Sequence, residues 1–127
     1  MGWPRHLMNP EALSGLFDSM DNLEMLNVFE ITFNREGPVV ALRADLSRFP
    51  EHPSKRWPAD ANRVQILIEF LGVEGLSLSG FETKNEGRLE VVPLQAGYAF
   101  TFHGQSLTLS GRGAGLRIAR VSAYLEA

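Results

Sequence analysis

The sequence predicts an α+β fold that is mostly β, with one N-terminal helix packed on an antiparallel sheet of about eight strands. Three observations indicate this class. Only one segment, near the N-terminus, has apolar residues at helical spacing. Short alternating runs then follow to the C-terminus, with glycine in nearly every gap. No gap after Leu46 has the helical pattern that a parallel crossover needs, so we expect an antiparallel sheet that is curved or sandwich-like.

The whole chain, 1–127, is expected to form one domain. Its 127 residues are 44% hydrophobic, which is enough for one core. The absence of cysteine excludes disulfides, thiol nucleophiles and cysteine-ligated metals. Residues 1–8 contain no apolar run of signal-peptide length, so we expect the protein to be cytoplasmic. These eight residues precede the first predicted element, and we expect them to form a flexible tail.

The predicted helix runs from about Pro10 to Met20. Asn9 stands before it as a candidate N-cap, and Pro10 suits the first helical position because the N–H it lacks would have no partner there. Spacings of three and four place four apolar side chains on one face, namely Leu13, Leu16, Phe17 and Met20.

The first alternating run predicts a strand with one strongly apolar face and one mixed face. The strongly apolar face consists of Met25, Asn27, Phe29, Ile31 and Phe33. A turn at residues 34–38 and a second alternating run at 39–46 complete a predicted β-hairpin.

Pro50, Pro53 and Pro58 interrupt any regular element and predict the longest loop. The run at residues 63–73 is apolar on both faces, which is typical of an interior strand. The remaining alternating runs are at 76–78, 88–94, 97–103, 105–110 and 116–125. The last of them keeps its apolar face only if its register slips, which predicts a β-bulge near Ala119–Arg120.

Short motifs predict neither a cofactor nor a metal site. The glycine-rich segment 111–115 departs from the dinucleotide-binding fingerprint, because position 116 is Leu and a strand follows it; we interpret it as a flexible hairpin turn. The three histidines are scattered, with no second ligand at metal spacing. Ser77 and Ser79 lack the setting of a serine nucleophile.

Carboxylates leave an enzymatic alternative open. Glu30, Glu69 and Glu90 lie in predicted strands and could meet across one face of the sheet. Two carboxylates flanking a scissile bond are the usual machinery of glycoside hydrolysis. The alternative function is therefore a small carboxylate-dependent hydrolase or carbohydrate-active domain.

The charge distribution favours a protein partner. A net charge of −3 argues against a protein whose main task is neutralising nucleic-acid phosphates, and we expect neither a nucleic acid nor a membrane as partner. Acidic residues concentrate between positions 11 and 36, where Arg35 is the sole cation, whereas arginines concentrate between 112 and 120. These two ends would neutralise each other if their strands paired. The candidate contacts for a basic partner are Asp18, Asp21, Glu24 and Glu30.

Trp57 is a further candidate contact, because it stands in a proline-stiffened loop directly after Lys55 and Arg56. Aromatic residues and arginine dominate the energetics of protein interfaces, so Trp57 could anchor a partner. The alternative is a lid, in which the indole folds back over a sheet edge and joins the core.

Several spaced segments resemble the immunity protein 50 family of bacterial polymorphic toxin systems. The segments that carry the resemblance are Phe29–Pro38, Leu42–Leu46, Lys55–Trp57, Asn62–Ile66 and Val121–Leu125. They follow one another in unbroken order, and the resemblance extends from Asn9 to Tyr124.

The resemblance implies a non-catalytic protein that binds a cognate toxin and neutralises it by occlusion. It carries over no catalytic or contact residues. An acidic surface would suit a basic toxin. A third possibility, in which an exposed sheet edge mediates self-association, leaves monomer and homodimer both open.

Overall fold

The computed structural model describes residues 2–127, and its strands form one open antiparallel sheet with the order β4-β7-β6-β5-β1-β2-β3-β8. The strands are β1 (Met25–Asn34), β2 (Val39–Leu46), β3 (Arg63–Leu71), β4 (Glu74–Ser79), β5 (Glu86–Pro93), β6 (Tyr98–Gly104), β7 (Thr108–Gly113) and β8 (Gly115–Tyr124). The mostly β fold and the antiparallel sheet of the predicted class are therefore confirmed.

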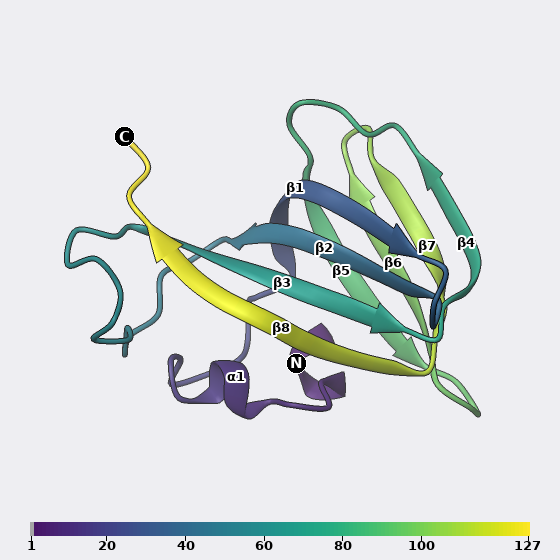
Figure 1. Cartoon of the computed structure of the whole chain (residues 1–127), viewed down its shortest axis with the longest axis horizontal. Coiled ribbons are helices and arrows are strands. Elements are labelled where there is room, and N and C mark those ends of the chain that lie inside the picture. The colour runs from purple at the N-terminus through teal and green to yellow at the C-terminus, as the bar shows by residue number, and fades with distance from the viewer. Residues whose placement is uncertain (1) are drawn as a thin grey trace.

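The sheet folds over on itself, so that β1, β2, β3 and β8 cross in front of β5, β6 and β7 (Figure 1). The inner faces meet in the core. Phe70 on β3 stacks on Phe100 on β6 with ring centroids 4.1 Å apart, and both side chains are buried. Stacked aromatic rings contribute beyond the apolar area they bury, so this pair holds the two layers together.

The chain passes from one layer to the other twice at the same corner, between β3 and β4 and between β7 and β8. β3 leads into β4 through Gly72, and β7 leads into β8 through Ala114, whose N–H donates to the carbonyl of Leu71 at 2.7 Å. A Cβ on Gly113 would lie 2.5 Å from the Tyr98 hydroxyl, so glycine is needed for this approach. The prediction of a flexible hairpin turn at 111–115 was wrong, because these residues are mostly strand and pair across the corner.

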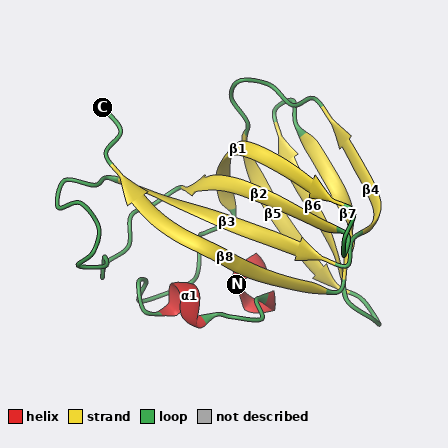
Figure 2. Ribbon diagram, viewed as in Figure 1, coloured by secondary structure: helices red, strands yellow, loops and turns green. Residues whose placement is uncertain are grey.

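The N-terminal helix is far shorter than predicted. The segment forms a 3-10 turn, η1 (Trp3–His6), and one α-helical turn, α1 (Glu11–Ser14), with Gly15 as its C-cap (Figure 2). Short helices are marginal by themselves, and glycine is a poor helix former. The predicted apolar face does reach the core, since Leu13 and Phe17 are buried.

The N-terminal segment is anchored from its start. Trp3 is 0% exposed, and its indole N–H donates to the carbonyl of Leu23 at 2.8 Å. From Trp3 onward, the segment expected to be a flexible tail therefore packs against the core. Met1 lies outside the described residues.

The strongly apolar face predicted for β1 is not its buried face. Leu26 and Val28 are buried, whereas Met25, Phe29 and Phe33 are 43%, 42% and 52% exposed. A bulge at Phe29 shifts the register against β2 and exchanges the two faces at this point. Beyond the bulge Phe33 shares the core face, but β1 pairs with β5 over residues 25–27 alone, so Phe33 lies at an uncovered edge.

The β-bulge predicted in the last strand is confirmed. Leu67 pairs with Arg120 and Ile68 with Ile118, so Ala119 is the extra residue. The bulge lets Leu116 and Ile118 face the core, while Val121 and Ala123 pack partly buried against it. Within residues 2–127, no helix has the length and apolar character needed to cross a membrane.

Candidate functional site

A row of hydrogen-bonded polar side chains crosses the outer face of β1, β2, β3 and β8. Arg43 Nε donates to Glu30 Oε1 at 3.0 Å, and Arg43 Nη1 donates to Gln65 Oε1 at 3.0 Å. Gln65 Nε2 donates to Asp45 Oδ1 at 3.0 Å, and the Tyr124 hydroxyl donates to Asp45 Oδ2. We call these five residues the polar row. Strand alternation places them opposite the core, because Gln65 on β3 lies between the buried residues Val64 and Ile66.

Asp45 is the most enclosed member of the polar row, at 6% exposed. Its two hydrogen bonds come from neutral donors, the Gln65 amide and the Tyr124 hydroxyl. Burial, and then the hydrogen bond to Asp45, raise the pKa of Tyr124 to about 12. Tyr124 therefore keeps its proton and remains a donor throughout the physiological range of pH.

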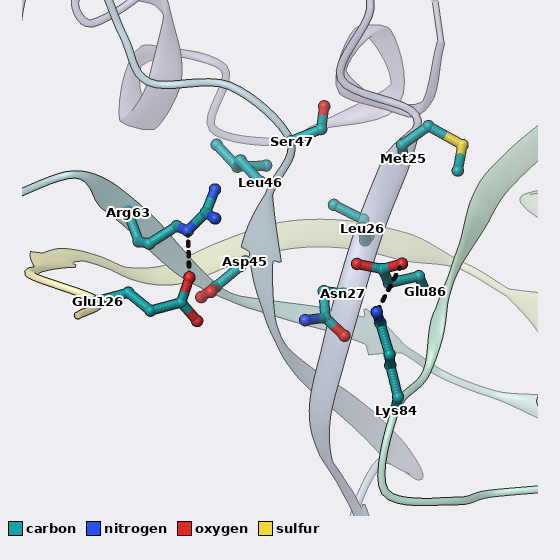
Figure 3. Close-up of a pocket in the computed structure, with 10 residues that line it drawn as sticks. All are labelled: Met25, Leu26, Asn27, Asp45, Leu46, Ser47, Arg63, Lys84, Glu86 and Glu126. Carbon is teal, nitrogen blue, oxygen red and sulfur yellow. Dashed lines mark hydrogen bonds and ion pairs between the residues drawn. The ribbon is translucent and has the colours of Figure 1, made fainter.

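A hollow of about 500 Å³ opens beside Asp45 (Figure 3). An ion pair between Arg63 Nε and Glu126 Oε1, at 2.9 Å, stands on one side of it. A looser pair between Lys84 Nζ and Glu86 Oε1, at 3.8 Å, stands on the other. The full lining is Met25, Leu26, Asn27, Asp45, Leu46, Ser47, Arg63, Lys84, Glu86 and Glu126.

This hollow contains charged groups of both signs, with three carboxylates against two cations. The Asn27 amide and the Ser47 hydroxyl also line it, and neither makes a side-chain hydrogen bond to any residue in the described range 2–127. Six of the ten lining residues lie on β1, β2 and β3, and Glu86 lies on β5, so the sheet forms most of the hollow, while Ser47, Lys84 and Glu126 come from segments outside the strands.

A second, smaller hollow of about 350 Å³ lies in the proline-rich loop. Trp57 lines it and packs edge-on against Phe49 with ring centroids 6.2 Å apart. Trp57 is half-buried against the core, as the lid alternative requires, while Lys55 and Arg56 are exposed. Trp57 is also partly exposed, so a contact role for it stays a prediction.

The predicted acidic contacts are not gathered on one face. Asp18 follows α1, and its Oδ1 lies 2.6 Å from Nε2 of His52. The backbone carbonyl of Asp21 accepts a hydrogen bond from Nη2 of Arg48 at 3.0 Å. Glu24 directly precedes β1, and Glu30 belongs to the polar row on the outer face.

The two ends of the chain do not neutralise each other as expected. Strand β8 pairs with β3, not with β1. Arg117 on β8 therefore lies 2.6 Å from Glu69 on β3. Arg112 lies on β7, which pairs with β4, and is 3.8 Å from Glu74 on that strand.

The three glutamates of the enzymatic alternative lie on three different strands, each beside a different basic side chain. Glu30 pairs with Arg43, Glu69 with Arg117, and Glu90 lies 4.0 Å from the His103 ring nitrogen. The structure therefore does not bring them together as a catalytic pair. Among residues 2–127, no group of three or more histidine, aspartate or glutamate side chains could hold a metal ion.

Sequence reasoning missed Asp45, Gln65 and Tyr124. The one available signal was a carboxylate in the 39–46 run, whose other residues are apolar apart from Arg43, because an acidic residue is uncommon in a strand interior. Its partners could not be identified, because Asp45 and Tyr124 are 79 residues apart in the chain.

Comparison with known proteins gives the family of the chain. Every member of the polar row comes from a segment that carries the family resemblance, and these segments lie on the neighbouring strands β1, β2, β3 and β8. No curated protein and no solved structure matches the chain. The family model described as Immunity protein 50 matches residues 9–124 of the 127. The chain therefore belongs to the immunity protein 50 family.

Proposed function

We propose that this protein is a non-catalytic immunity protein of the cytoplasm, which binds a cognate toxin domain and neutralises it by occlusion. The observation that carries the proposal is the family match over residues 9–124. The pairing of charge supports it, because two of the carboxylates considered for an enzymatic role, Glu30 and Glu69, are each paired with an arginine.

The test is to combine the protein with the toxin-domain protein encoded beside it. Occlusion predicts an equimolar complex that co-purifies, and protection that reaches its end point at one equivalent. Protection at far less than one equivalent would indicate an enzyme acting on the toxin. Absence of both complex and protection would overturn the proposal.

We also propose Asp18, Asp21, Glu24, Glu30 and Trp57 as contacts with a basic toxin. Complementary charge accelerates encounter, so Glu24→Lys together with Glu30→Lys should slow association and flatten its dependence on salt. Glu36→Lys together with Glu82→Lys, at two exposed acidic residues outside the proposed contacts, is the matched control. Unchanged association of the double variant would remove these acidic contacts from the interface.

Self-association has one supporting observation. β4 is an edge strand whose six residues are all exposed, including Leu76 and Leu78. Uncovered edges can pair with another copy. Sedimentation at increasing concentration tests this alternative, since a strict monomer would eliminate it.

A further inference from the structure

We propose that the hollow beside Asp45 receives a lysine or arginine side chain of the partner protein, with the Asp45 carboxylate as its counter-ion. This inference rests on the proposed function and deepens it, by naming the surface and the chemistry of recognition. It places the centre of the interface on the outer face of β1, β2 and β3.

The first argument is the state of the Asp45 charge. A buried carboxylate is costly unless it is paired, and Asp45 is held by two neutral donors. The two nearby arginines are engaged elsewhere, since Arg43 bonds Gln65 and Glu30 while Arg63 Nε bonds Glu126. The pKa of Arg63 is raised chiefly by Glu126 and to a smaller extent by Asp45. Within residues 2–127, Asp45 makes no ion pair.

The second argument is the balance of charge in the hollow. Asp45, Glu86 and Glu126 outnumber Arg63 and Lys84, so the hollow carries one excess negative charge. An entering cation would meet the carboxylates of Asp45 and Glu126 on one side of the hollow and that of Glu86 on the other (Figure 3). Potentials of opposite sign give specificity and speed association.

The third argument is that the lining suits a long cationic side chain. Met25 is 43% exposed and offers apolar surface for the methylene stem. The Asn27 amide and the Ser47 hydroxyl offer unused hydrogen-bonding groups for the charged end. The volume of about 500 Å³ lies within the range of pockets that bind whole small molecules, so one side chain fits.

A partner carboxylate is the competing occupant. It would have to bind Lys84, whose side chain is 76% exposed and only 3.8 Å from Glu86, or displace Glu126 from Arg63 at 2.9 Å. It would also approach the buried Asp45 against like-charge repulsion. Lysine or arginine is therefore the favoured occupant.

The test is the affinity of purified variants for the purified toxin-domain protein, measured by surface plasmon resonance. Asp45→Asn keeps the side chain's shape but removes its charge, and should weaken binding at least tenfold, mainly through faster dissociation. Glu90→Gln is the matched control on the outer face of β5, and should bind within about twofold of the wild type.

A second variant guards against loss of folding in Asp45→Asn. Met25→Arg supplies a cation in cis from an exposed position at the edge of the hollow, so the fold should survive while binding weakens at least tenfold. Circular dichroism and thermal unfolding check that both variants are folded.

The outcomes separate the two proposals. If the wild-type protein does not bind the toxin domain, the proposed function fails. If the wild type binds and both folded variants bind equally well, only the hollow is excluded from the interface. Double-mutant cycles with toxin variants identify the occupant, because coupling of Asp45 to a lysine or arginine supports the inference and coupling of the hollow to a toxin carboxylate overturns it.

Discussion

Asn9 and Ile118, which are 109 residues apart in the sequence, are joined by two hydrogen bonds on the free side of β8. Asn9 Nδ2 donates to the Ile118 carbonyl at 2.8 Å, and the Ile118 N–H donates to Asn9 Oδ1 at 3.0 Å. The Met8 N–H donates to the Leu116 carbonyl nearby, at 2.7 Å. The N-terminal segment thus covers the edge of the sheet that β8 would otherwise expose. Asn9 therefore binds a strand instead of capping the helix.

Asn9→Ala should destabilise the protein by about 1–3 kcal/mol, because it removes two hydrogen bonds and leaves backbone groups of β8 without these partners. Urea denaturation followed by circular dichroism measures the loss. Gln95→Ala is the matched control, since Gln95 is exposed and makes no side-chain hydrogen bond to residues 2–127. Equal stability of the two variants would contradict the role given to Asn9.

Both tyrosines should resist ionisation in the folded protein. Burial raises the pKa of Tyr98, and burial together with the bond to Asp45 raises the pKa of Tyr124 to about 12. Tyrosine in an unfolded chain has a pKa of about 10. The stabilisation contributed by Tyr124 is therefore fully present below about pH 10 and is lost as the pH rises through about 12.

Ultraviolet titration of tyrosinate in a Tyr98→Phe background isolates Tyr124. The transition should lie well above that of the same protein in denaturant. Adding Asp45→Asn should lower the pKa of Tyr124, because Asp45 contributes to raising it. Ionisation of the folded protein near pH 10, about the value of free tyrosine, would contradict the hydrogen-bonded geometry of this pair.

Phe70→Ala and Phe33→Ala should differ sharply in stability. Phe70 is fully buried and stacks on Phe100, so its truncation should cost about 3–5 kcal/mol. Phe33 is 52% exposed, and its loss should cost less than about 1 kcal/mol. Chemical denaturation of the two variants compares the burial of the two rings directly. If Phe33→Ala lowered the free energy of unfolding as much as Phe70→Ala does, the Phe33 side chain would have to be packed in solution, which would contradict its exposed position.

Gly113→Ala should destabilise the corner between β7 and β8 by about 1–3 kcal/mol, because the added Cβ would lie 2.5 Å from the Tyr98 hydroxyl. Gly15→Ala adds the same methyl group where nothing lies within 4 Å and where φ is −81°, so stability should change by less than about 1 kcal/mol. Differential scanning calorimetry measures both shifts. Similar melting temperatures for the two variants would show that the corner can relax around the methyl group.

Local patterns were sufficient for much of the fold. Alternation of apolar residues located the strands, and the register slip in the last run located the bulge at Ala119. The buried face of β1 was predicted wrongly because a bulge at Phe29 interchanges the core face and the outer face, and no local sequence pattern predicts that bulge. The helix was overestimated because Leu13 and Phe17 share one face at helical spacing, yet a single helical turn and the turn that follows it also bring both side chains to the core.

The candidate site depended on pairing between distant strands. The number of strands, the absence of cysteine chemistry and the likeness to an immunity protein family could be predicted from residue identities and spacings. Each of these features depends on single residues or short segments of the chain. The meeting of Asp45, Gln65 and Tyr124 is not local, since it requires β2, β3 and β8 to lie side by side in a particular register. That register follows from burying Phe70 and its neighbours between the layers, which is a property of the assembled sheet.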